Sequence, residues 1–167
     1  MASDLGYSCG SCGEWHDELP LSYGAPFPEY WTDELAGDEA SGLSEDQCVI
    51  KGEHFFVHGL IEIPVTDAGE TFSWGVWVSL SQANYDRMSE LWETEGRESE
   101  PPYFGWLSTQ LPYSPETLNL KTLLHTRAVG ERPVIELEPT DHPLAVEQRT
   151  GISLDRVKEV AGLMLHG

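Results

Sequence analysis

The sequence predicts an α+β fold: a mostly antiparallel sheet with a few helices, preceded by a loop-rich N-terminal arm. Runs of alternating apolar residues follow one another between residues 48 and 139, one helical pattern interrupts them, and further helical patterns follow after residue 140. Strands in succession with helices between and after them are typical of this class. Because 167 residues suffice for one core, we expect a single domain, 1–167, made of the arm (1–47), the sheet (48–139) and the C-terminal helices (140–167).

The arm has no sustained apolar period. After a pair of cysteines come the stretch L-P-L-S-Y-G-A-P-F-P-E-Y-W, which is punctuated by Pro and Gly, and the acidic stretch D-E-L-A-G-D-E-A-S-G-L-S-E-D. Such composition indicates turns and loops, with one helical turn near residues 29–35. We therefore expect a segment without a core of its own.

Two strands are predicted at the start of the sheet region. The run 49–65 places five apolar residues on one face, and Gly59 interrupts that face, which suggests a bulge. These five are Phe55, Val57, Ile61, Ile63 and Val65. In the next run Phe72, Trp74, Val76, Val78 and Leu80 alternate with Ser73, Gly75, Trp77 and Ser79. That alternation predicts a half-buried strand.

A helix is predicted after this strand. Ser79 and Gln82 have the spacing of a capping box. Apolar residues then recur at helical spacing until Gly96, namely Ala83, Tyr85, Met88, Leu91 and Trp92.

The rest of the chain predicts more strands and then helices. Strands are expected at 103–111 and 118–129, and V-G-E-R-P turns the second into a hairpin strand at 134–138. The buried face of the second strand is Leu118, Leu120, Thr122, Leu124 and Thr126. Pro143 suits the first turn of a helix that Gly151 ends, and Ser153 caps another. That last helix carries Val157, Val160, Ala161 and Met164.

The formal net charge is −20, and it is unevenly distributed, since no lysine or arginine precedes Lys51. This charge argues against nucleic acids and anionic membrane surfaces as partners and is complementary to that of a basic protein. Charge alone does not separate an acidic face for such a partner from acidity that serves only solubility, which is the first interpretation. No run approaches the roughly 20 apolar residues of a membrane helix, and the N-terminus lacks a signal-peptide pattern, so we expect a cytoplasmic protein.

Cys9 and Cys12 have the C-x2-C spacing of a knuckle that directs two thiolates to one metal ion, with Gly13 easing the turn. Zinc takes four ligands, and Cys48 is the only other cysteine in the sequence. A redox role is less favoured, because no strand precedes Cys9 and its flanking residues are acidic. The cysteines can also be unligated, as two surface thiols and one buried apolar residue.

The fourth zinc ligand is open between a histidine and water. His16 is the first candidate because it closely follows the cysteine pair, and His54 is the second. His58 lies on the same predicted strand as His54, about 13 Å away at roughly 3.3 Å per residue, so one ion cannot bind both. Four protein ligands make a structural site, whereas an open position makes a catalytic one. We predict a structural zinc ion held by Cys9, Cys12, His16 and Cys48.

The sequence favours a non-enzymatic, zinc-held module that binds or regulates another protein. It contains no P-loop, G-x-S-x-G or H-E-x-x-H motif. The alternative is a small enzyme, such as a metal-assisted hydrolase, with an open zinc or a pocket that contains His125, Arg132 or His142. His125 also shares a strand face with Lys121 and Arg127, a basic cluster able to receive a carboxylate or phosphate. Trp74, Trp77, Trp92 and Trp106 fit an aromatic pocket or the core.

Motifs along nearly the whole chain carry a family resemblance. They are C-x-x-C-G-x-x-H-x-x-L-P, D-Q-C-V-I, F-F-V-H-G, W-G-V-W-V-S-L-S, F-G-W-L, L-P-Y-S-P-E-T-L-N-L-K, E-R-P and H-P-L-A-V-E-Q-R-T-G-I-S. In these motifs the chain resembles the bacterial domain of unknown function numbered 2199. The resemblance implies one domain over the whole length, a bacterial cytoplasmic setting and the grouping of the four predicted zinc ligands. It implies no activity.

Overall fold

The computed structural model describes the backbone of residues 7–8, 15–16 and 19–166, and the side chains from residue 19 to 164. The strands are β1 (Tyr7–Ser8), β2 (Trp15–His16), β3 (Ser22–Gly24), β4 (Gly42–Leu43), β5 (Gln47–Ile50), β6 (His54–Val65), β7 (Glu70–Leu80), β8 (Tyr103–Leu107), β9 (Lys121–His125) and β10 (Val134–Leu137). The α-helices are α1 (Gln82–Glu90), α2 (Pro143–Thr150) and α3 (Leu154–His166), and 3₁₀ helices lie at Asp33–Gly37 and Arg97–Ser99. The predicted α+β class is confirmed.

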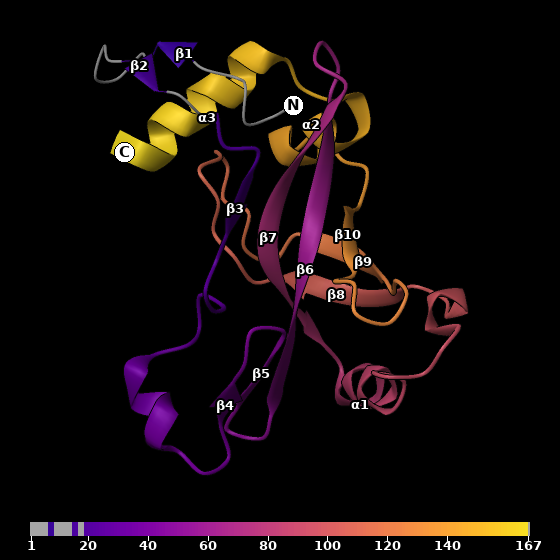
Figure 1. Ribbon diagram of the computed structural model, residues 1–167. Coiled ribbons are helices and arrows are strands. Elements are labelled where there is room, and N and C mark those ends of the chain that lie inside the picture. Colours follow the sequence, from indigo (N-terminus) through magenta and orange to yellow (C-terminus); the bar gives the residue numbers. More distant parts are fainter. Residues whose placement is uncertain (1–6, 9–14, 17–18, 167) are drawn as a thin grey trace.

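Strands β6 to β10 form a small barrel (Figure 1). β6 and β7 make a long antiparallel hairpin, and β8 and β9 continue the antiparallel order. β10 pairs with β9 and closes the barrel by lying parallel to β6, with Val134 beside Leu60. The sheet is thus mostly antiparallel, as predicted, and the closure is a tertiary feature that strand patterns do not encode.

Gly59 lies in a regular part of β6, opposite Val76, so the predicted bulge is wrong. A Cβ atom here would lie 2.6 Å from Cδ1 of Ile135 and 3.1 Å from the carbonyl oxygen of Pro133. The neighbouring Leu60 N–H donates a hydrogen bond of 2.9 Å to that same carbonyl. A glycine is therefore required because β10 approaches β6 closely at the closure.

The interior of the barrel is the main core. Both predicted inward faces, on β6 and on β7, are buried. α2 and α3 lie at one end of the barrel, where Leu144, Val157 and Val160 join the core (Figure 1). As predicted, Pro143 starts α2 and Gly151, with a φ of 85°, ends it.

Two predicted strands are shorter in the structure. The strand expected at 103–111 ends at Leu107, and beyond it the Thr109 Oγ1 accepts a hydrogen bond of 2.9 Å from the Trp77 N–H. The strand expected at 118–129 begins only at Lys121, since Asn119 has a φ of 68°, which extended backbone does not allow. A side-chain hydrogen bond replaces backbone pairing at the first place, and a residue with left-handed backbone precedes the strand at the second.

Helix α1 occurs where it was predicted, but its cap differs. The Ser81 hydroxyl, rather than that of Ser79, accepts a hydrogen bond of 3.2 Å from the Asn84 N–H. Ser79 remains in β7, opposite Phe56. Neither α1 nor any other helix in the described ranges has the length and hydropathy required to cross a bilayer.

The arm is loop-rich but also extends the sheet. β3 pairs in parallel with β7, and β4 lies beyond β5. The expected helical turn lies a few residues later, as the 3₁₀ helix Asp33–Gly37. Between these elements the arm crosses the outer face of the sheet and buries a second cluster, which we call the covered cluster: Trp31, Cys48, Ile50, Phe56 and Trp77.

Candidate functional site

The outer face of the sheet is divided by the arm into two halves. One row of cross-strand neighbours runs over it in the order Cys48, Phe56, Ser79, Trp106 and Lys121. Cys48 and Phe56 are buried beneath the arm, whereas Trp106 is 42% exposed. The arm thus covers the β5–β7 half of this face and leaves the β8–β9 half open.

A cleft of about 570 Å³ lies where the two halves meet. Its lining residues are Tyr30, Ile50, Lys51, His54, Phe56, Ser79, Trp106, Ser108 and Asn119. Tyr30 of the arm stacks on Phe56, with 6.1 Å between ring centroids, and its hydroxyl donates a long hydrogen bond of 3.4 Å to Asn119 Oδ1. Trp106 supplies a third aromatic surface. The volume and the aromatic lining are those of a small-molecule site.

The polar groups of the cleft are mainly hydrogen-bond donors. Lys51 and His54 lie at the turn between β5 and β6, and Asn119 contributes its amide. The Ser108 hydroxyl donates to the carbonyl oxygen of Trp106, at 3.0 Å. No aspartate or glutamate is among the described residues that line the cleft, although the chain has 29 acidic residues against nine lysines and arginines. The cleft is therefore a non-acidic opening in an acidic protein.

Two lining residues, Lys51 and Asn119, have a left-handed backbone, with φ of 54° and 68°. Of the non-glycine residues that the structure describes, only these two have a positive φ. The turn Ile50–Glu53 is closed by a backbone hydrogen bond of 3.1 Å, and both central residues, Lys51 and Gly52, have positive φ, as in a type I′ turn. Asparagine, aspartate or glycine normally takes the place of Lys51, since the left-handed region costs other residues about 1 kcal/mol.

The arm holds this strained turn in place. The Lys51 N–H donates to the Ser41 hydroxyl, and the Gly52 N–H donates to the carbonyl oxygen of Ala40, both at 2.8 Å. Ser41 in turn donates to the Asp38 carboxylate at 2.8 Å. That hydrogen bond and a second from the Ala40 N–H lower the pKa of Asp38. The conformation of Lys51 is thus fixed by the arm and by the hairpin together.

The predicted zinc ligands lie only partly within the described residues. Cys9 and Cys12 lie outside them, and only the backbone of His16, in β2, is described. Cys48 is buried in the covered cluster, and burial raises the pKa of its thiol to about 11. In Figure 1 the β1–β2 hairpin lies at the end of the molecule that holds α3, opposite the end that holds β5. Within the described ranges no group of three or more His, Cys, Asp or Glu side chains can hold a metal ion, so the four-ligand site stays a prediction.

The two rival histidines lie on one strand, β6, in different surroundings. His54 is exposed and lines the cleft. His58 is only 7% exposed, its ring stacks on Trp77 with centroids 4.9 Å apart, and its Nδ1 lies 3.0 Å from the carbonyl oxygen of Glu45. Because a carbonyl only accepts, Nδ1 carries the proton, and Nε2 has no hydrogen-bond partner among the described residues. Burial, the largest cause, lowers the pKa of His58.

The predicted basic cluster on β9 is largely neutralised. His125 Nε2 lies 2.8 Å from Glu136 on β10, and Arg127 pairs with Glu62 on β6. Lys121 alone of the three has no ion-pair partner among the described residues. The cluster is therefore not a ready site for an anion, and Lys121, the cross-strand neighbour of Trp106, lines two other hollows rather than the cleft.

The other two residues considered for an enzyme pocket also make structural contacts. Arg132 pairs with Asp46, at 3.0 Å. The His142 Nδ1 accepts a hydrogen bond of 3.1 Å from the Leu144 N–H and so caps α2, while its Nε2 donates to the carbonyl oxygen of Pro115 at 2.8 Å. These residues stabilise loop and helix positions at separate places in the fold.

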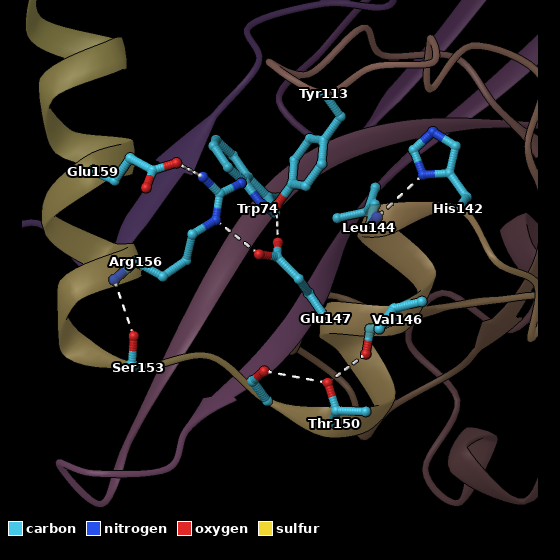
Figure 2. A network of polar contacts seen from close by, with 11 residues as sticks. Trp74, Tyr113, His142, Leu144, Val146, Glu147, Thr150, Ser153, Arg156 and Glu159 are labelled. Carbon is cyan, nitrogen blue, oxygen red and sulfur yellow. Dashed lines mark hydrogen bonds and ion pairs between the residues drawn. The ribbon is translucent and has the colours of Figure 1, made fainter.

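Figure 2 shows a polar network that joins α2 and α3. Arg156 on α3 pairs with Glu147 on α2 at 2.7 Å. The Tyr113 hydroxyl donates to the other oxygen of that carboxylate and accepts a hydrogen bond of 3.2 Å from Trp74 Nε1. Burial and the contact with Glu147 raise the pKa of Tyr113. Because these groups satisfy one another, the network fixes the two helices on the barrel rather than presenting a reactive site.

Comparison with known proteins identifies the family. A family model described as an uncharacterized protein conserved in bacteria, DUF2199, matches residues 8–152, a range that includes every residue lining the cleft. No curated protein and no solved structure matched the chain. The resemblance seen in the sequence motifs is thereby confirmed. The chain belongs to the bacterial family of domain of unknown function 2199.

Proposed function

We propose that this protein is a non-enzymatic binding module whose aromatic cleft holds a small organic ligand. The observation that carries the proposal is the cleft of about 570 Å³ between Tyr30, Phe56 and Trp106. Sites for small ligands are concave, largely apolar and equipped with a few convergent polar groups, and this cleft has each of these properties.

The position of the arm supports a preformed cleft. The Glu29 N–H donates a hydrogen bond of 2.9 Å to the carbonyl oxygen of Ser108, a residue that lines the cleft. The Gln110 N–H donates to the Glu29 carboxylate at 3.3 Å. These two hydrogen bonds hold Glu29, and with it the adjacent Tyr30, next to the sheet. A ligand therefore need not order the arm before it binds.

The lining favours binding over catalysis. His54 and Ser79 are diagonal neighbours on β6 and β7. Among the described residues that line the cleft, they are the pair that could act as general base and nucleophile. Among the described contacts no hydrogen bond joins them, and no carboxylate lines the cleft to orient His54. Nucleophilic catalysis by serine requires both features. A hydrolase that uses His54 and Ser79 is the alternative function.

The predicted zinc ion has a structural role in this proposal. A clasp of Cys9, Cys12, His16 and Cys48 would fix the arm, which has no core of its own. The raised pKa of Cys48 means that its thiolate would need a nearby cation such as zinc. The separation of β2 and β5 in Figure 1 makes Cys48 the ligand on which the clasp is best tested.

A basic protein partner remains a second proposal, and it concerns a different surface. The acidic residues Asp33, Glu34, Glu39 and Glu45 of the arm are exposed. Exposed charge of one sign steers an oppositely charged partner and speeds association. Such a partner would contact the outside of the arm, so both proposals can hold together.

A fragment screen by NMR tests the proposed function. Aromatic fragments are expected to shift the indole N–H signal of Trp106 in the full-length protein. Trp106→Ala should abolish binding, whereas Leu123→Ala is the control, because Leu123 is 39% exposed on the same face of the sheet but does not line the cleft. Fragments that bind both variants equally, or hydrolysis of a bound ester that Ser79→Ala abolishes, would contradict the proposal.

A further inference from the structure

We infer that the ligand of the cleft is an organic anion, a carboxylate or phosphate attached to a planar apolar group. This inference rests on the proposed binding function and adds the chemical class of the ligand. The charge, shape and backbone strain of the cleft each support it separately.

The distribution of unpaired cations supports an anionic ligand. The six arginines of the chain are each engaged by carboxylates or carbonyl oxygens within the described structure. The three lysines, Lys51, Lys121 and Lys158, have no hydrogen-bond or ion-pair partner for the ammonium group in that part of the chain. One unpaired lysine, Lys51, thus lines the cleft, and Lys121 is the cross-strand neighbour of the lining residue Trp106 without lining the cleft itself.

The uncharged polar groups agree with this assignment. Asn119 Oδ1 accepts the hydrogen bond from Tyr30, which leaves the two amide hydrogens of Asn119 for a ligand. Lys51 adds three donors, and the Ser79 hydroxyl lies on the floor between Phe56 and Trp106. Hydrogen bonds from such donors are strongest when the acceptor is ionised.

The aromatic lining indicates the shape of the apolar part. The Tyr30 and Phe56 rings are tilted by only 30° from each other, and Trp106 borders the same space. Flat aromatic surfaces bind flat apolar groups by offset or edge-to-face stacking. A planar ring of the ligand can therefore rest against these walls while its anionic group reaches the β5–β6 turn.

The strain at Lys51 is the third observation. In the sequence I-K-G-E the turn would be easier to form with asparagine before glycine, and lysine has no backbone reason to be there. Strained residues persist where the surrounding structure holds them, and they gather at ligand sites. Here Ser41 and Ala40 hold the turn, and the result is a lysine side chain that lines the cleft.

The net negative charge of the protein does not prevent binding of a small anion. The Debye length is about 8 Å at physiological ionic strength, so remote carboxylates are screened. Asp38 lines a neighbouring hollow together with Glu34 and Lys51, and its carboxylate is already bonded to Ser41 and Ala40 of the arm. Among the described residues that line the cleft, Lys51 is the only lysine, arginine, aspartate or glutamate.

Isothermal titration of the full-length protein with three matched probes tests the ligand class. The probes are 2-naphthoate, 2-naphthyl phosphate and 2-naphthylmethylammonium, which share one ring system and differ in the charged group. We expect the preferred anion to bind at least about tenfold more tightly than the ammonium probe, since one charge-assisted hydrogen bond contributes about that factor. The order of naphthoate and naphthyl phosphate separates a carboxylate ligand from a phosphate ligand.

Lys51→Asn distinguishes a functional lysine from an incidental one. The change creates an Asn-Gly turn, so the melting temperature should rise by about 2–4 °C while the affinity for the anion falls about tenfold. Lys158→Gln removes one positive charge from α3, away from the cleft, and should leave the affinity unchanged. A stabilised Lys51→Asn variant that binds the anion as well as wild type would overturn the inference.

The outcomes also separate this inference from the proposed function. Tighter binding of the ammonium probe at the cleft would retain the binding function and reject the anionic class. If none of the three probes binds, although Trp106 is exposed in a folded protein, both the class and the proposed function fail. Anion binding that Trp106→Ala does not weaken would place the site elsewhere and reject the inference.

Discussion

The two halves of the outer face have the same alternation of side chains, but one half is buried and the other is exposed. On β7 and β5, Trp77 and Cys48 are buried beneath the arm, and Trp77 has no exposed surface at all. On β8 and β9, Phe104, Trp106 and Leu123 point outward on the same face and remain 43%, 42% and 39% exposed. The difference is made by the arm, which covers one half and contributes Tyr30 at the boundary with the other.

This comparison shows how one sheet face can serve both as core and as binding surface. Burial turns the first half into a second core, so its residues are constrained by packing. The second half keeps large apolar side chains in water, which is uncommon for contiguous groups in soluble proteins and typical of interaction sites. The cleft lies at the boundary, where the arm supplies Tyr30 and the open half supplies Trp106.

The largest expected difference between the halves is in stability. Trp77→Ala should lower the free energy of unfolding by about 3–5 kcal/mol, because it leaves a cavity in the covered cluster and removes the indole hydrogen bond to the Ala25 carbonyl oxygen. Trp106→Ala should lower it by less than about 1 kcal/mol. Urea denaturation followed by circular dichroism measures both. Similar losses for the two variants would show that the halves are not distinct.

Removal of the predicted zinc ion tests whether the metal holds the arm over the β5–β7 half of the sheet. Purified protein should contain about one zinc ion per chain by elemental analysis, and a chelator should make Cys48 accessible to a thiol reagent. Cys48→Ala should lose the metal if all four predicted ligands bind it. Cys9→Ser is the comparison, since it should lose the metal whether or not Cys48 is a ligand. Protein with no zinc and three freely reactive thiols would reject the clasp.

A smaller effect is expected from the buried histidine of the covered half. The pKa of His58 is lowered by burial, so the unfolded chain, with an ordinary pKa near 6.5, binds a proton more readily. Stability should therefore be greatest above about pH 6.5, decline as the pH falls toward the lower folded pKa, and change no further from this group below it. Denaturation of wild type and His58→Gln between pH 7.5 and 5 measures the effect. Identical pH dependence in both proteins would contradict it.

The smallest stability effect should come from the open half. Phe104→Ser and Leu123→Ser should each change the free energy of unfolding by less than about 0.5–1 kcal/mol and should improve solubility, because both side chains already contact water. Thermal denaturation measures the change in stability, and a precipitation assay measures the change in solubility. A large loss of stability would mean that these residues are covered in solution, for example by a second copy of the chain.

Much of the fold could be predicted from local pattern. The alternation on β6 and β7, the helix after residue 81 and the Pro143 and Gly151 signals at α2 depend on neighbouring residues alone. The wrong predictions concern residues whose role depends on contacts between segments far apart in the sequence. Gly59 has the sequence appearance of a bulge, yet it exists because Ile135 approaches from β10.

The candidate site was much less predictable. Of the lining residues, the sequence indicates Trp106 as an aromatic and His54 as an alternative zinc ligand, but it gives no sign that Tyr30, Phe56 and Asn119 belong to a site. The pair Lys51-Gly52 between two apolar runs was a usable signal for a tight turn with a strained lysine. The rest could not be inferred, because the lining residues come from five separate segments between residue 30 and residue 119.

The sequence by itself determined the α+β class, the inward faces of the strands, the acidic character and the family. These depend on composition and on periods of a few residues, which act locally. Only the tertiary structure decided that the sheet closes into a barrel and that the arm covers half of its outer face. It alone placed Lys51 against the aromatic cleft, because C-G-S-C-G-E-W-H and the arm after it carry no period that specifies where the chain must pack.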